Sequence, residues 1–116
     1  MKKFVVVYRV PVEVMEEWKK NTPPEVMREQ GEKLGADMMA WTKKHDMALV
    51  DKGLPLGKNT RLTSEGAKAV TNDLNYYQVL EAESIDAAVE MLKDNPHIQV
   101  IPEAFLDIME VPHMGM

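Results

Sequence analysis

A histidine and an aspartate stand side by side in the segment WTKKHDMALVDKGLPLG, residues 41–57. An imidazole with an ordinary pKa near ~6.5 exchanges protons at neutral pH, and a carboxylate that holds it in place completes an acid–base pair. His45 and Asp46 are therefore the first candidates for chemistry. Successive residues of a helix point about 100° apart, so these two side chains do not face each other if the segment is helical. The partner of His45 is expected to come from another element.

Two other acidic residues could meet His45. Asp107 lies in AFLDIMEV on the same face of an expected strand as Phe105 and Met109. An acidic side chain in an otherwise apolar row indicates an edge reached by water or a polar pocket. Asp51 follows the same helical segment as His45, and its alternative role is to tie down the DKGLP turn.

Three aromatic residues are candidates for ligand contact. Trp41 shares a helical stripe with His45, where the alternative is a core position. Tyr77 has an apolar body and a polar tip, so it suits either a cavity wall or the core. His97 is expected in a loop, facing solvent, a partner subunit or a site. His45, His97 and His113 lack metal-ligand spacing, so no metal is predicted, and the absence of a glycine-rich phosphate loop predicts no cofactor.

Composition limits the class of protein. The 116 residues fit a single domain, 1–116, with a short tail at 112–116 that we expect to be mobile. A net charge of −5 without a basic cluster excludes a nucleic-acid partner. No cysteine is present, which excludes disulfides, thiolate catalysis and Cys-ligated zinc. The apolar run Phe4–Tyr8 is too short for a signal peptide and no segment suits a membrane span, so we expect a soluble cytoplasmic protein.

The elements that position the candidates begin with a strand at residues 3–9. Its unbroken apolar run is typical of a strand covered on both faces. Residues 12–20 predict a weak amphipathic turn or two. Thr22, followed by two prolines and Glu25, has capping-box spacing, which predicts a helix from Pro23 to the region Val50–Lys52.

One stripe of that helix carries the expected buried side. Gly31 and Gly35 each cost roughly 1 kcal/mol relative to alanine, so they indicate either a break in the helix or close packing of the backbone. Close packing is favoured because Gly31 lies on the stripe. Gly53 is the expected left-handed cap, with Pro55 just beyond it. The stripe consists of Met27, Gly31, Leu34, Met38, Trp41, His45 and Ala48.

The second half repeats the pattern. Residues 59–70 predict a short strand, a turn at 64–66 and a further extended piece, and residues 75–83 predict another strand. A helix follows from Ser84, its N-cap, to the stop at Asn95-Pro96, and residues 104–111 predict the last strand. The order β, α, β, β, α, β is that of an α+β ferredoxin-like sandwich, an antiparallel sheet with two helices on one face. The apolar first strand leaves the other face apolar, and pairing in a homodimer would bury it.

Three segments resemble the YCII-related family: AWTKKHDMALVDKGLPLG, then NYYQVLEAESIDAAVEMLKDNPHI, then FLDIMEV, within residues 38–111. The resemblance implies a ferredoxin-like subunit of a dimeric α/β barrel, with a pocket between sheet and helices or at the barrel mouth. It further implies that a minority of relatives use a histidine and an aspartate as acid and base. The D-G-P-F motif of many relatives is absent here, where VTNDLNYY stands instead, so no role of that motif carries over.

Two functions remain open at this stage. The first is a homodimer that binds a small organic molecule, with no chemistry. The second is a cofactor-independent enzyme of isomerase, lyase or dehalogenase type, in which His45 is the acid/base and Asp107 or Asp51 orients it. The enzyme hypothesis requires a carboxylate within hydrogen-bonding range of His45 and an open cavity beside both.

Overall fold

The computed structural model describes residues 1–112, so the predicted tail lies outside the described residues except for Pro112. Ten of the elements are helices or strands and one is a single 3-10 turn. In chain order they are β1 (Lys2–Arg9), α1 (Val12–Asn21), α2 (Pro24–Lys44), η1 (Asp46–Ala48), β2 (Leu49–Asp51), β3 (Asn59–Thr63), β4 (Gly66–Val70), β5 (Leu74–Ala82), α3 (Ile85–Leu92), α4 (Pro96–Val100) and β6 (Phe105–Glu110).

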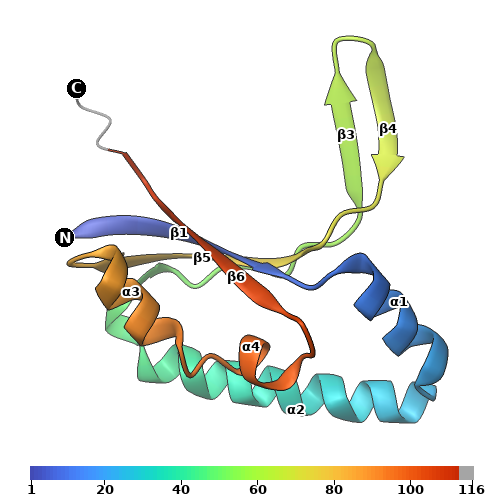
Figure 1. Cartoon of the computed structure of the whole chain (residues 1–116), viewed down its shortest axis with the longest axis horizontal. Coiled ribbons are helices and arrows are strands. Elements are labelled where there is room, and N and C mark those ends of the chain that lie inside the picture. Colours follow the sequence, from blue (N-terminus) through green and yellow to red (C-terminus); the bar gives the residue numbers. More distant parts are fainter. Residues whose placement is uncertain (113–116) are drawn as a thin grey trace.

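Four strands form one antiparallel sheet in the order β2-β5-β1-β6. β1 and β2 are both antiparallel to β5, which lies between them, so they form one split β-α-β unit. β5 and β6 flank β1 in the same way and form the second unit. Helices α2, α3 and α4 lie on one side of this sheet (Figure 1). The chain therefore has the predicted α+β, ferredoxin-like architecture.

Alternation along β1 decides what each face of the sheet presents. Phe4, Val6 and Tyr8 are fully buried against the helices, whereas Val5, Val7 and Arg9 point the other way and are only half-buried. The predicted burial of both faces of this strand is thus observed for one face within residues 1–112. We call the face away from the helices the open face. The core on the helix side is completed by Trp41, Leu49, Leu80, Ala82, Ala88 and Leu92.

Helix α2 ends earlier than predicted. It stops at Lys44, and the residues expected to continue it form the 3-10 turn and the short edge strand β2. Leu49 pairs with Leu80 of β5, so burial against the sheet and ladder hydrogen bonds replace the last helical turn. The predicted cap at Thr22 is also absent, because α2 has Pro23 as its N-cap with no side-chain cap hydrogen bond.

Residues 59–70 do not join the main sheet. β3 and β4 pair with each other as a separate hairpin, which rises from the end of the sheet (Figure 1). We call this hairpin the arm. The second half also differs in its helices, since Asn95 starts a further short helix, α4, where a loop was expected. Helix α1 has ten residues, more than the turn or two predicted. Within residues 1–112, no helix is both long and apolar enough to cross a membrane.

Glycine 53 has the predicted positive φ, at 82°, but it follows strand β2 rather than a helix. Asp51 accepts a hydrogen bond from the Gly53 amide at 2.8 Å, which ties down the turn. A Cβ added at Gly53 would lie 1.6 Å from the carbonyl oxygen of Tyr77. The close packing that we predicted at Gly31 is wrong, because a Cβ there would meet nothing within 4 Å.

Replacing Gly53 by alanine is expected to destabilise the fold by at least about 2 kcal/mol, since the left-handed backbone and the contact with Tyr77 both oppose a side chain. Urea unfolding followed by circular dichroism measures the change.

The Gly31→Ala variant is the control of opposite sign. Its site is open and helical, so the free energy of unfolding should rise by about 0.5–1 kcal/mol. A Gly53→Ala chain as stable as wild type would contradict the described turn.

Candidate functional site

The six residues singled out from the sequence fall into three separate places. Trp41 and His45 lie at the end of α2, where Lys44 and Asp94 join them; we call these four residues the helix-end cluster. His97 lies in a buried network between sheet and helices. Asp51, Tyr77 and Asp107 all lie on the open face of the sheet.

In the helix-end cluster, the acid that meets His45 is Asp94. His45 Nε2 lies 3.8 Å from Asp94 Oδ1, just beyond hydrogen-bonding distance, and no side chain of residues 1–112 hydrogen-bonds this buried nitrogen. Asp94 instead accepts from Trp41 Nε1 at 2.9 Å and from Lys44 Nζ at 2.8 Å. These hydrogen bonds, that of Lys44 first, lower the pKa of Asp94. Asp94 therefore fixes the Trp41 side chain through a hydrogen bond, whereas it forms none with the imidazole of His45.

Burial favours the neutral form of His45. Burial lowers its pKa below the ordinary value, and the charge of Asp94 opposes this shift only in part. The ring packs against Trp41 with 4.6 Å between centroids. Asp46, its neighbour in sequence, points elsewhere and pairs with Lys52 at 2.7 Å. The prediction that these adjacent residues form no dyad is confirmed.

The acids that we expected to orient His45 have other partners. Asp107 Oδ2 lies 2.7 Å from Arg9 Nε. The Nε hydrogen is not aimed at that oxygen, so the contact is an ion pair rather than a hydrogen bond. Asp51 accepts from the hydroxyl of Tyr77 at 3.1 Å.

Four polar side chains form a buried network beneath β1: Tyr8, Gln78, Asn95 and His97. The hydroxyl of Tyr8 donates to Gln78 Oε1 and accepts from Asn95 Nδ2 at 2.9 Å. Asn95 also caps α4 through the amide of His97 at 2.9 Å, and His97 Nε2 lies 3.0 Å from the Arg9 carbonyl. Burial raises the pKa of Tyr8. Because each member has a partner, the network is built to hold α4 on the sheet.

The open face brings three of the candidates together. Tyr77, Val7 and Asp107 are cross-strand partners in one row over β5, β1 and β6. Neighbouring strands lie ~5 Å apart, so Tyr77 and Asp107 are separated by roughly 10 Å along this row. The next row contains Val79, Val5 and Met109, and at its β2 edge Asp51 pairs with Val79.

Charged partners flank that polar row. Arg9 lies between Asp107 and Asp73, whose Oδ1 accepts from Arg9 Nη1 at 2.6 Å. Hydrogen bonding to Asp51 raises the pKa of Tyr77, because ionising the phenol would place two negative charges together. With three carboxylates and one guanidinium, this part of the open face is rich in hydrogen-bond acceptors.

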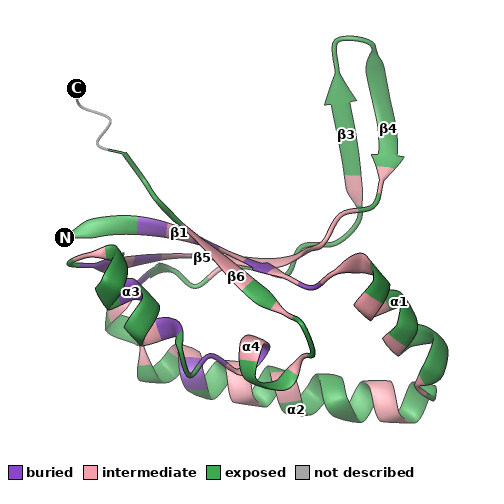
Figure 2. Cartoon of the chain, viewed as in Figure 1, coloured by how far each residue is buried: buried purple, intermediate pink, exposed green. Residues whose placement is uncertain are grey.

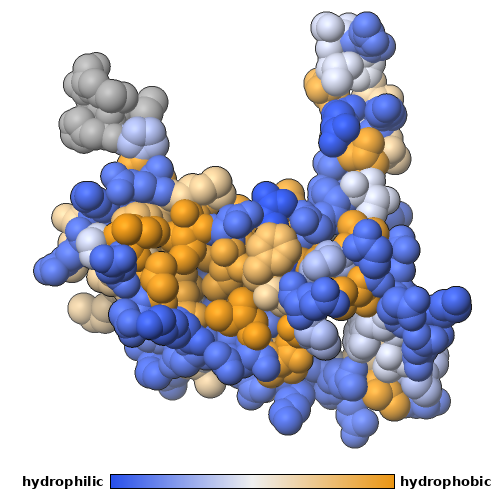
Figure 3. Space-filling model, in the orientation of Figure 1, coloured by the Kyte–Doolittle hydropathy of each residue, from blue (hydrophilic) through white to orange (hydrophobic). Residues whose placement is uncertain are grey.

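Among the hollows on the surface are two that His45 does not line. The larger, about 310 Å³, lies between α3, α4 and β6 in an apolar region that Figure 3 shows over α3 and β6; its lining is Val89, Leu92, Lys93, Ile98, Ala104, Phe105, Leu106 and Ile108. The smaller, about 160 Å³, lies at the root of the arm, between 56–59 and 72–74. The enzyme hypothesis therefore stays a prediction.

Sequence reasoning missed Arg9, Asp73, Asp94 and the network around Asn95. Asn95 carried a readable signal, since an asparagine before proline is a good N-cap and the proline suits the first helical position. Asp73 and Asp94 gave none, because their roles depend on residues 64 and 53 positions away along the chain. In the described part of the chain, no group of three histidine or acidic side chains could hold a metal ion.

The strand order defines the class as a ferredoxin-like α+β domain. No family model matches the chain, and no curated protein matches it. Among solved structures, one that matches is 5-chloro-2-hydroxyhydroquinone dehydrochlorinase (TftG) from Burkholderia phenoliruptrix AC1100, in complex with 2,5-dihydroxybenzoquinone. The identity is 14% and the TM-score 0.48, over 92% of this chain and 91% of that one. A likeness of this size indicates no shared activity.

Lowering the pH from about 7.5 to about 5.5 is expected to destabilise the fold through His45 and His97. Burial lowers the pKa of both, against the charge of Asp94 for His45 and the Arg9 carbonyl for His97. Both return to ~6.5 when the chain unfolds. The unfolded chain then binds more protons below that pH, so the free energy of unfolding falls as the pH drops.

Urea unfolding at the two pH values measures this loss. In a His45→Gln/His97→Gln double variant most of the pH dependence should disappear. An equally steep fall in the double variant would assign the dependence to other groups.

Proposed function

We propose that the chain works as a homodimer whose subunits pack their open sheet faces together, and that it binds a small organic molecule between them. The observation that carries the proposal is the open face itself. Three of the candidate site residues, Asp51, Tyr77 and Asp107, lie on it beside a row of uncovered apolar side chains.

The apolar row supports the association of two subunits. Val5 and Val79 are only half-buried, and Met109 is 46% exposed. Burying such side chains gains roughly 25 cal/mol for each Å² removed from water. Two sheets that pack face to face lie about 10 Å apart, a distance that side chains of this size fill. The resulting closed structure is the dimeric α/β barrel expected from the sequence.

The polar side chains on and beside the open face support the choice of ligand. Asp51, Asp73 and Asp107 offer carboxylate oxygens, and within residues 1–112 only Arg9 forms ion pairs with any of these three, namely Asp73 and Asp107. A carboxylate accepts hydrogen bonds and repels anions, so the site favours a neutral or cationic molecule with hydroxyl or amino groups. Tyr77 adds an aromatic surface on which a planar ligand can pack.

The YCII-related assignment and the cytoplasmic location are proposals too. The three segments that resemble the YCII-related family occupy these parts of the fold: residues 40–57 run from the end of α2 through β2 and the turn at Gly53, residues 75–98 cover most of β5, α3 and the start of α4, and residues 105–111 include β6. Each of the three segments contributes one strand to the main sheet, namely β2, β5 or β6. They support a shared architecture more than a shared reaction.

Light scattering is expected to give twice the chain mass for wild type and a single chain mass for Met109→Glu. The substitution introduces a charge into the apolar row, and the exposed side chain allows the subunit to fold unchanged.

Met47→Glu is the matched control, because Met47 is 99% exposed and lies in the 3-10 turn away from the open face. It should remain dimeric. A wild-type chain that is monomeric at micromolar concentration would overturn the proposed dimer.

Thermal-shift screening is expected to find stabilisation by hydroxylated aromatic compounds or aromatic amines, and none by carboxylates of the same skeleton. A ligand at 100 times its Kd adds about 2.7 kcal/mol to the free energy of unfolding. Asp107→Asn and Tyr77→Phe should each reduce the shift, because they remove a charge and a hydroxyl from the polar row.

Asp46→Asn is the control for charge, since Asp46 is exposed and pairs only with Lys52 among the described residues. It should bind as wild type does. Equal loss in all three variants, or a shift caused by carboxylates alone, would contradict the proposed site.

A further inference from the structure

Among the residues that the structure describes, the arm forms no strand pairing or side-chain hydrogen bond with the rest of its subunit. Its strands, Asn59–Thr63 and Gly66–Val70, pair only with each other within residues 1–112, and its side-chain hydrogen bonds stay inside the hairpin. Residues 60–69 are all exposed, and Figure 2 shows the arm in green except for pink at the lower ends of its strands, where Asn59 and Val70 are half-buried. A lone two-stranded hairpin is at best marginally stable in water. Contact with another surface would therefore stabilise the extended hairpin.

Each face of the arm is unfavourable in isolation. On one face Leu62, which is 78% exposed, stands opposite Ala67, and Thr60 stands opposite Ala69. On the other face Arg61 stands directly opposite Lys68. Like charges in directly opposite positions destabilise an antiparallel pair.

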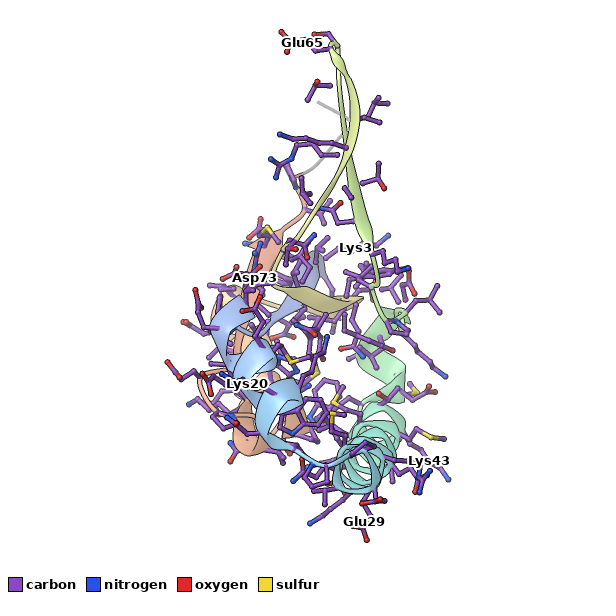
Figure 4. All side chains as sticks on the ribbon, turned by 90° about the vertical axis from the view of Figure 1, so that its right-hand side faces the viewer. Lys3, Lys20, Glu29, Lys43, Glu65 and Asp73 are labelled. Atoms are coloured by element: carbon purple, nitrogen blue, oxygen red, sulfur yellow. The ribbon has the colours of Figure 1, made fainter. Side chains whose placement is uncertain are left out.

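The arm projects to the side of the sheet that carries the open face. In Figure 1 the helices lie below the sheet and the arm rises above it, and Figure 4 shows the same after a quarter turn. In that view Glu65 marks the tip of the arm, while Lys43 and Glu29 of α2 lie at the opposite end of the molecule. A subunit seated on the open face would therefore stand beside the arm.

Charge also favours a second copy of this chain as the partner. Acidic residues outnumber basic ones 19 to 14 in the whole chain, whereas the arm has the reverse balance, with Arg61 and Lys68 against Glu65. An acidic neighbour would relieve the repulsion between Arg61 and Lys68. Two cations are too few to hold a nucleic acid by its phosphates.

We propose that the arm is a clasp: it lies against the second subunit, with Arg61 and Lys68 toward acidic side chains of that subunit. The inference rests on the proposed dimer and adds to it a second contact region outside the sheet faces. By two-fold symmetry each subunit holds the other, so the clasp acts twice in each dimer.

Hydrogen exchange tests whether the second subunit orders the arm. Amides of residues 60–69 should exchange slowly in the wild-type dimer and at least ~10-fold faster in the Met109→Glu monomer, since a free hairpin opens readily. Amides of β1 and β5 in the same samples report whether the subunit itself remains folded. Equal protection of the arm in dimer and monomer would overturn the clasp.

Charge reversal tests the contact surface. In the Arg61→Glu/Lys68→Glu double variant the dimer dissociation constant should rise on the order of tenfold or more, and less at high salt, as measured by analytical ultracentrifugation. Lys33→Glu/Lys43→Glu makes the same change of net charge on exposed positions of α2 and should leave the constant near the wild-type value.

The two proposals fail in different ways. A monomeric wild-type chain would remove both. A wild-type dimer that Met109→Glu dissociates, and that the arm variant leaves as tight as before, would retain the proposed dimer and remove only the clasp.

Discussion

The alternation of side chains along β1 is the constraint on which the rest of the structure depends. β1 is hydrogen-bonded on both edges, to β5 and β6, so it cannot rotate or slip without breaking two ladders. A shift of one residue would expose Phe4, Val6 and Tyr8 and would turn Arg9 into the core. The register therefore fixes both the buried side, where Tyr8 meets the network that holds α4, and the open side, where Arg9 and Val7 meet Asp107.

Much of this architecture could be predicted from local sequence signals. Where the prediction was wrong, tertiary contacts had overridden the local signal. The strands at β1, β5 and β6 and the helix capped by Ser84 were predicted because each has a sufficient local pattern. The end of α2 was not, since the stripe continues through Ala48 in the 3-10 turn and gives no sign that Leu49 will pair with Leu80. Local periodicity cannot show when a sheet supplies a better partner than the next helical turn.

The same distinction explains the site. From the sequence, His45 and its neighbouring acids were the natural centre, because a histidine near a carboxylate is what proton transfer needs. In the fold, Asp94 lies next to His45 but accepts hydrogen bonds from Trp41 and Lys44, and burial lowers the pKa of the imidazole. Asp107 and Tyr77, which are 30 residues apart in the chain, become members of one row only because both strands flank β1. A shared row across a sheet depends on register, which single-sequence patterns do not encode.

The arm and the open face are best considered together, because each is costly alone. A subunit that leaves Val5, Val79 and Met109 partly uncovered loses burial, and a hairpin that extends away from its own core gains none. Packing of the open faces alone would bury the apolar row but leave the arm without support. Contact with the arm alone would leave Val5 and Val79 exposed to water. The proposed second subunit, standing on the open face and reaching the arm, would account for both. A second copy meets that requirement with surfaces already present in the chain: a matching apolar row, and an acidic excess to set against the cations of the arm.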